Sequence, residues 1–171
     1  YGGLTQTVPL LPGSAAIGAA STSCPALDQR GAARSTPVCD AGAFESGGFA
    51  LTIAGGNHQS TPVSTTFPTP LAITVAPLNP GEPVDGGHIS FLGPASGAST
   101  NPPTNTATIA GGGVAQTVTA NAVAGGPYDV VASANGTDAV AFTLTNTLFT
   151  TTTIISSPNP SVFGQAATFT A

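Results

Sequence analysis

The stretch YDVVASANGTDAVAFTLTN, residues 128–146, holds two runs of alternating side chains on either side of a turn signal. In the second run Phe142 and Leu144 share one face, while alanine and threonine occupy the other. A period of two with one apolar face is typical of a half-buried antiparallel strand. Asn135 and Gly136 between the runs are residue types that adopt the positive φ of a tight hairpin turn. The stretch therefore predicts a β-hairpin.

Similar runs precede this hairpin from residue 49 onward. They are ALTIA (50–54), LAITVA (71–76), HISFLG (88–93), ATIAG (107–111) and VAQTVTA (114–120). Together with the hairpin they make seven strands within about 100 residues, which fits an immunoglobulin-like sandwich. We predict an all-β chain with an Ig-like antiparallel β-sandwich at residues 49–147, and we expect Phe91 and Phe142 in its core.

Charge is almost absent from this chain. Charged residues make up 5% of it, both cationic side chains are arginines, and the net charge is −5. An ordinary soluble domain carries roughly 25% charged residues, so hydroxyl groups and open glycine backbone must hydrate this surface. Without a cationic stripe the chain is unsuited to nucleic acid or to anionic lipid. No apolar run approaches the roughly 18 residues of a transmembrane helix, so we expect no direct membrane insertion.

Two further segments flank the predicted sandwich. Residues 1–47 hold short apolar clusters and then a cysteine-bearing loop, and residues 150–171 read TTTTIISSPNPSVFGQAATFTA. The second segment has room for two or three strands at most, and a hairpin alone is marginal in water. We interpret it as the truncated start of a further Ig-like module that is frayed or borrows a partner.

The first segment resembles the C-terminal end of right-handed parallel β-helix repeat proteins of bacterial surfaces. The run LLPGSAAIGAAS (10–21) is followed by Cys24, by DQRG (28–31), by Cys39 and by DAGAFE (40–45), in the order of that family. The chain departs from it at Gly18, where the family commonly carries Asp. The resemblance implies that residues 1–47 are the terminal rungs of a parallel β-helix with a cap loop.

The remaining segments resemble bacterial Ig-like repeats. The stretches that carry the resemblance are IAGGNHQSTPVSTTFPTPLAITV (53–75), FLGPASGAS (91–99), NAVAGGPYDVVASANG (121–136) and FTLTNT (142–147). The stretch TTTTIISSPNPSVFGQ (150–165) resembles the first strands of another repeat of the kind found in tandem arrays. These resemblances imply an exported, multidomain protein that is secreted or held at the cell surface.

The stretch CPALDQRGAARSTPVCD, residues 24–40, contains both cysteines and both arginines. Catalysis, metal binding and structural stapling are the candidate roles. A zinc site needs four nitrogen or sulfur ligands, and His58 and His88 lie in the next module without paired spacing. A C-x-x-C redox motif is absent. The exported context implied by the resemblance favours a disulfide between Cys24 and Cys39, worth up to ~3 kcal/mol, and we expect no metal and no cofactor.

The charged residues of this loop are Asp28, Arg30, Arg34, Asp40 and Glu45. They have the composition of an acid/base cluster, but no rule places two of these carboxylates across a sugar. The alternative is a cap-loop polar network in which Arg30 donates to a carboxylate or to free carbonyls where the solenoid ends. In polysaccharide-degrading β-helices, catalysis would lie on earlier rungs.

Two other polar sites have structural and functional interpretations. Glu82 and Asp85 lie in a Gly/Pro turn and have the chemistry to help hold calcium between modules, although the D-x-[DN]-x-[DN]-G loop is absent. Asn135, Gly136 and Thr137 form a glycosylation sequon, but a hairpin turn explains the same residues.

The sequence thus favours a non-enzymatic structural or spacer fragment of an exported bacterial surface protein, adhesin-like in organisation. The alternative is the C-terminal part of an extracellular β-helix polysaccharide lyase or hydrolase whose catalytic rungs lie upstream. A third hypothesis is an adhesive module. The expected partners are neighbouring domains of the same chain and an extracellular protein or glycan ligand.

Overall fold

The computed structural model describes residues 2–21, 24–150, 155–157, 162–166 and 168–170, and within them it is all-β with no helix. The prediction of an all-β chain is confirmed. The strands are β1 (Ala20–Ser21), β2 (Val38–Cys39), β3 (Phe49–Gly55), β4 (Gln59–Pro62), β5 (Leu71–Pro77), β6 (His88–Leu92), β7 (Thr104–Thr108), β8 (Gly113–Gln116), β9 (Gly125–Ser133), β10 (Val140–Thr147), β11 (Ile155–Ser157) and β12 (Thr168–Thr170). The described residues accordingly contain no helix that could span a membrane.

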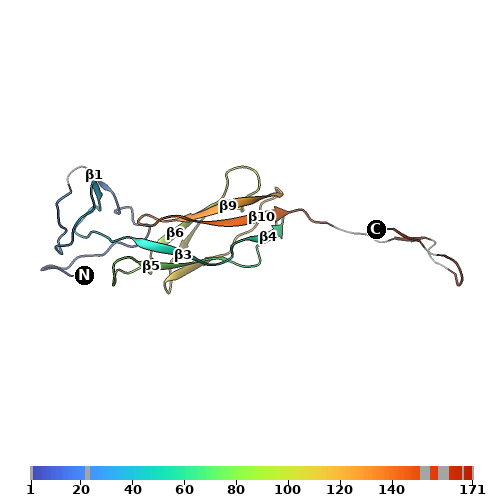
Figure 1. Cartoon of the computed structure of the whole chain (residues 1–171), viewed down its shortest axis with the longest axis horizontal. Coiled ribbons are helices and arrows are strands. Elements are labelled where there is room, and N and C mark those ends of the chain that lie inside the picture. The colour runs from blue at the N-terminus through green and yellow to red at the C-terminus, as the bar shows by residue number, and fades with distance from the viewer. Residues whose placement is uncertain (1, 22–23, 151–154, 158–161, 167, 171) are drawn as a thin grey trace.

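Two sheets pack face to face as a β-sandwich (Figure 1). One has the order β4-β10-β9-β6-β7 and the other the order β3-β5-β8. Every pair in them is antiparallel except β4 with β10, which run parallel. The chain therefore leaves β3 in the smaller sheet and crosses to β4 in the larger one.

The sandwich core is built from the inward faces of the alternating runs. Phe91 of β6 and Phe142 of β10 are fully buried, and their ring centroids lie 6.2 Å apart. Leu71 and Ile73 of β5 face them from the other sheet and are equally buried. Burying such side chains stabilises a fold by roughly 1.5–3 kcal/mol each, which explains why the runs with one apolar face became strands.

Strand β4 was not predicted, and β7 begins earlier than predicted. The sequence of β4, QSTP, has no apolar alternation, because only Thr61 is buried and the strand lies at a sheet edge. Its ladder comes from β10, with Leu144 opposite Gln59. β7 covers residues 104–108 rather than 107–111, because a threonine-rich edge strand needs no alternating apolar face.

The connection between β9 and β10 is wider than the predicted tight turn. It spans residues 134–139, and Gly136 has a positive φ of 83° while Asn135 does not. The turn closes on itself through a bond from Thr137 N to Ala134 O at 3.3 Å. The physical reason for the width is a contact from outside the hairpin, because Gly13 N donates to Asn135 O at 3.0 Å.

Residues 2–21 and 24–48 lie at one end of the sandwich (Figure 1). Among their described residues the strand pairs are antiparallel: β1 with β2, and an isolated bridge from Leu27 to Ala33. The expected terminal rungs of a parallel β-helix therefore do not appear there as a parallel ladder. A rung forms that ladder only with a neighbouring rung, so the β-helix stays a prediction.

Beyond β10 the structure describes a short antiparallel hairpin of β11 and β12, with Ile155 opposite Thr170. This hairpin lies past the end of the sandwich that is remote from β1 (Figure 1). Of the predicted module start at 150–171, residues 151–154, 158–161, 167 and 171 lie outside the described residues.

Candidate functional site

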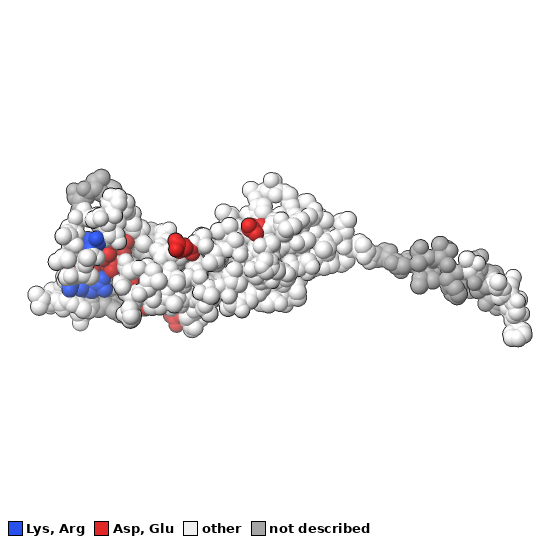
Figure 2. All heavy atoms as spheres, in the orientation of Figure 1, with Lys and Arg blue, Asp and Glu red and all other residues white. Residues whose placement is uncertain are grey.

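Charged side chains gather at the end of the molecule that holds residues 2–21 and 24–48 (Figure 2). Both arginines of the chain lie there beside acidic residues, whereas most of the visible sandwich surface is uncharged. We call residues 24–45 the cap loop. Because it contains both cysteines and both arginines of the chain together with three acidic residues, it is the candidate functional site.

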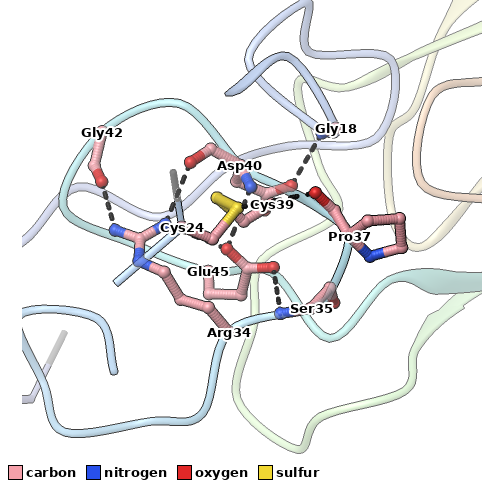
Figure 3. Close-up of a disulfide and its surroundings, with 9 residues drawn as sticks. All are labelled: Gly18, Cys24, Arg34, Ser35, Pro37, Cys39, Asp40, Gly42 and Glu45. Atoms are coloured by element: carbon pink, nitrogen blue, oxygen red, sulfur yellow. Dashed lines mark hydrogen bonds and ion pairs between the residues drawn. A yellow bond between two sulfur atoms is a disulfide. The ribbon is translucent and has the colours of Figure 1, made fainter. Parts of the chain in front are cut away.

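A disulfide joins Cys24 and Cys39 at the base of the cap loop, with the two Cα atoms 6.0 Å apart (Figure 3). Cys39 is 2% exposed and lies in β2, opposite Ala20 of β1. The bridge therefore ties the cap loop to the short β1–β2 ladder. The described residues contain no free cysteine that would act as a nucleophile.

Asp28 is the acceptor at the centre of the cap loop. Its Oδ1 accepts backbone N–H groups of Arg30 at 2.8 Å and Ala32 at 3.0 Å. Its Oδ2 accepts Glu45 N at 3.0 Å and the guanidinium of Arg30, with Nη2 at 2.7 Å. Burial raises the pKa of Asp28, but these hydrogen bonds together outweigh it and lower the pKa to about 2.

Glu45 has a similar environment and pairs with Arg34 (Figure 3). Its Oε2 accepts Arg34 Nη1 at 3.0 Å and Asp40 N at 2.9 Å, while Oε1 accepts Ser35 N at 2.9 Å. Burial raises the pKa of Glu45, and the hydrogen bonds from Asp40, Ser35 and Arg34 bring it below its ordinary value. Arg34 also donates to the carbonyl oxygens of Asp40 and Gly42.

Asp40 connects the cap loop to the chain on both sides of it. Its Oδ1 accepts Gly18 N at 2.8 Å and its Oδ2 accepts Ser46 N at 2.7 Å. Gly18 has a φ of 65°, a conformation that glycine adopts without the strain other residues meet. Gly18 thus lies in a turn whose N–H group faces the carboxylate of Asp40.

Arg30 lies over an aromatic ring. Its guanidinium carbon is 3.4 Å from the centroid of Phe44, and its Nη2 donates to Glu45 O at 2.6 Å. Phe44 is 2% exposed. Cation–π contact and hydrogen bonding therefore hold Arg30 on the inner side of the cap loop.

The structure thus brings the five predicted polar residues into one network. Three of them, Asp28, Asp40 and Glu45, are 5–7% exposed and accept hydrogen bonds from backbone amides and arginines. A general acid needs a proton near neutral pH, whereas the lowered pKa values of Asp28 and Glu45 keep both ionised there. The arrangement is chemically suited to holding backbone in place.

Glu82 provides a link that sequence reasoning missed. It is 6% exposed, and its carboxylate accepts Ser46 Oγ at 2.8 Å, Gly47 N at 3.0 Å and Asn79 Nδ2 at 3.1 Å. Glu82 therefore fastens the end of the cap loop to the β5–β6 connection of the sandwich. The only sequence signal was a carboxylate in a Gly/Pro turn, which we interpreted as a calcium candidate.

Two other residues considered as metal ligands, Asp85 and His88, also have hydrogen-bond partners within the chain. Asp85 accepts Gly111 N at 3.1 Å and Gly112 N at 2.8 Å, and His88 Nδ1 lies 3.2 Å from Thr108 Oγ1. Within the described residues no group of three or more His, Cys, Asp or Glu side chains is arranged to hold a metal ion.

A second contact joins the N-terminal part to the sandwich. We call residues 9–18 the cap segment. His88 N donates to Pro12 O at 2.9 Å, and Pro12 is fully buried. Ile17 packs against the sandwich core, and a Cβ on Gly136 would lie 3.0 Å from its Cδ1. The cap segment thus closes one end of the apolar core.

Comparisons of this chain with known proteins found no match. No protein-family model, no curated protein and no solved structure matches the chain. The functional interpretation therefore depends on the contacts described above.

Proposed function

We propose that this chain is a non-enzymatic structural spacer from an exported bacterial surface or secreted protein, with neighbouring domains as its partners. The N-terminal part serves as the terminal cap of a β-helix, and the sandwich serves as an Ig-like module that holds it away from its anchor. Tension between the two ends passes through the sandwich.

The observation that carries this proposal is the position of the two ends of the sandwich. β3 begins at the end where the cap loop lies, and β10 finishes at the opposite end, from which the chain continues toward β11 (Figure 1). A module that joins neighbours in a line needs this arrangement, because its length then separates the domains that it connects.

The parallel pair of β4 and β10 supports a load-bearing role. Four residue pairs join the strands, from Leu144 with Gln59 to Thr147 with Pro62, and Val63 N adds a bond to Thr147 O at 2.8 Å. Pulling the chain from its two ends draws these parallel strands past each other. Their hydrogen bonds are then loaded together rather than one after another, which raises the force needed to separate them.

The strand order supports assignment to the Ig-like class. The first two strands of the sandwich are split between its two sheets, because β3 pairs with β5 in one sheet and β4 pairs with β10 in the other. The central order β10-β9-β6 corresponds to the G-F-C strands of immunoglobulin sandwiches, and β3-β5-β8 corresponds to A-B-E.

The cap loop supports the β-helix assignment and the export. Solenoids need terminal elements that close their last rung, and a loop held by a disulfide and a buried ionic network is such an element. Structural disulfides persist in oxidising compartments, which favours an extracellular or cell-surface location.

The burial of the carboxylates supports a non-enzymatic role. A glycoside hydrolase ordinarily needs two carboxyl groups that face an open groove with room for a sugar, and a lyase needs a base that reaches the sugar. In the described residues Asp28, Asp40 and Glu45 face backbone amides instead. The polysaccharide-degrading alternative would therefore have to place its catalysis outside the cap loop.

Single-molecule stretching between the two ends tests the load-bearing function. Val63→Pro removes the N–H group that bonds Thr147 O, so we expect it to lower the unfolding force. Leu51→Ala in β3 is the control, because it weakens core packing without touching the β4–β10 pair. If both variants lose the same unfolding free energy in urea but only Val63→Pro unfolds at a lower force, the load-bearing role of the β4–β10 pair is supported. A wild-type sandwich that unfolds at the same force as Val63→Pro would contradict the proposal.

A further inference from the structure

We propose that the Asn135–Gly136 bond is a site of spontaneous self-modification, at which deamidation releases the cap segment from the sandwich. This inference is independent of the proposed spacer function. It concerns the connection between β9 and β10 and the three hydrogen bonds that this connection makes with the cap segment and with the first residue of β3.

Of the two groups that must react, one makes no hydrogen bond within the described residues and the other belongs to an exposed side chain. The nucleophile is the backbone nitrogen of Gly136, which donates no hydrogen bond among the described residues. The electrophile is the side-chain amide of Asn135, an exposed residue whose Nδ2 makes a single bond, to Ser14 O at 3.2 Å. Asn135 is also the only asparagine in the chain that precedes a glycine, the residue that hinders the nitrogen least.

An aspartate–glycine pair in the same molecule provides an internal contrast. Asp85 precedes Gly86, but Gly86 N donates to Ile109 O at 2.9 Å. The carboxylate of Asp85 accepts two backbone amides, from Gly111 and Gly112. Both reacting groups are therefore held at Asp85, whereas the nitrogen that follows Asn135 is not.

The reaction balances with water as the only co-reactant. Gly136 N loses its proton and attacks Asn135 Cγ, so that a C–N bond forms and the side-chain nitrogen leaves as ammonia. The intermediate is a five-membered succinimide. Water then adds to one of its two carbonyl carbons and opens the ring. Opening yields either an ordinary aspartate in place of Asn135 or isoaspartate, in which the main chain runs through the former side chain.

Both products would weaken the attachment of the cap segment. The aspartate product would have no amide N–H for Ser14 O and would place a negative charge beside that carbonyl oxygen. Isoaspartate inserts one more carbon into the main chain, which displaces Gly136 O from Phe49 N, now at 2.7 Å. The bond from Gly13 N to Asn135 O, at 3.0 Å, lies on the same turn and would shift with it.

The first test ages the intact native protein in mildly alkaline buffer, followed by peptide mapping with mass spectrometry. We expect the side-chain amide of Asn135 to be converted progressively to a carboxyl group, with isoaspartate as the main product. We expect no isoaspartate at Asp85. Asn135→Gln, which keeps an amide donor, is the matched control and should stay unmodified. If native protein remains unmodified at Asn135 while urea-unfolded protein reacts there, the folded turn protects the site and the proposal is wrong.

The second test asks whether modification releases the cap segment. The aged protein is separated from the unaged, and amide hydrogen exchange is compared between them. We expect exchange at Gly13 N and Phe49 N to be about tenfold faster in the aged form, with β5 and β6 unchanged. Equal exchange in both forms would show that the cap segment stays attached, and would overturn the release.

Discussion

The hydroxyl of Tyr128 donates to Oδ1 of Asn146 at 2.7 Å inside the sandwich, at 9% and 2% exposure respectively. The Nδ2 of Asn146 donates in turn to Ser99 O at 3.0 Å, Asn121 Oδ1 at 2.9 Å and Val123 O at 3.2 Å. One side chain thus ties strand β10 to strand β9 and to the two loops beside them. Buried polar groups are costly when unpaired, so this network should respond sharply to substitution.

Removing the hydroxyl of Tyr128 should destabilise the sandwich. Tyr128→Phe keeps the ring but leaves Asn146 Oδ1 without its donor, and we expect a loss of about 1–3 kcal/mol of unfolding free energy. Asn146→Ala leaves several buried groups unpaired and should cost at least about 3 kcal/mol. Thr147→Ala, at an exposed neighbour in β10, should change stability by less than about 0.5 kcal/mol. Urea unfolding measures all three, and equal values would contradict the role of the network.

Alkaline pH should unfold the protein through the same tyrosine. Burial raises the pKa of Tyr128 from 10.0 to about 12, although the bond to Asn146 opposes this shift. The stabilisation is therefore fully present below pH 10 and is lost as pH rises toward 12. Absorbance of the phenolate during a pH titration, compared with Tyr128→Phe, checks the shift. Ionisation of Tyr128 near pH 10 without unfolding would show that the burial has no energetic effect.

Opening the disulfide should loosen the cap loop and leave the sandwich intact. Cys24 and Cys39 are separated by 15 residues, and closing such a loop is worth about 3 kcal/mol. In Cys24→Ala/Cys39→Ala we expect the amides of Ser35 and Asp40 to exchange about a hundredfold faster. The amides of β9 should not change. Faster exchange in β9 as well would mean that the cap loop and the sandwich unfold as one unit.

Acid should weaken the cap loop over a defined range of pH. The pKa of Asp28 lies at about 2 instead of 3.8, so its stabilising contribution is present above pH 3.8 and is lost as pH falls to about 2. Glu45, whose pKa is also lowered, contributes in the same direction. Amide exchange of Ala32 measured across this range follows the loss. An exchange rate in Asp28→Asn that still varies with pH as in the wild type would rule out Asp28 as the cause.

The joint between the cap loop and the sandwich should depend on the charge of Glu82. In Glu82→Gln an NH₂ group replaces one of the two carboxylate oxygens. It replaces either Oε1, which accepts Gly47 N and Asn79 Nδ2, or Oε2, which accepts Ser46 Oγ. We expect a loss of about 1–3 kcal/mol of unfolding free energy. Asp138→Asn is the matched control, because Asp138 is exposed. Limited proteolysis near residues 46–48 should accelerate in Glu82→Gln alone. Equal cleavage in both variants would contradict the link.

The strands that the sequence predicted are those with one apolar face. The runs at 50–54, 71–76 and 138–146 became β3, β5 and β10 with small shifts at their ends, because each buries alternate side chains in the same core. β4 could not be found in this way. It is an edge strand held by the backbone of β10, and a backbone ladder leaves no mark in the side-chain pattern.

The candidate site was predictable in its members more than in its contacts. The crowded cysteines and charges singled out residues 24–45, and the resemblance to β-helix ends implied a cap loop there, but nothing near Glu82 in sequence showed that it would be buried. The alternation of β10 puts Asn146 on the same face as Phe142 and Leu144 without indicating its partners. Each is satisfied by groups far along the chain, such as Ser46 for Glu82 and Ser99 for Asn146. Such partners meet only after the sheets have packed.

The amino-acid sequence by itself determined that this chain is all-β, where most strands of its sandwich lie and which side chains form the core, since these depend on local alternation and hydrophobicity. The tertiary structure alone decided how the N-terminal part is fastened, through Glu82, Pro12 and the turn at Asn135. The reason is that hydrogen bonds and burial between distant segments depend on their positions in space, which no short window of sequence encodes.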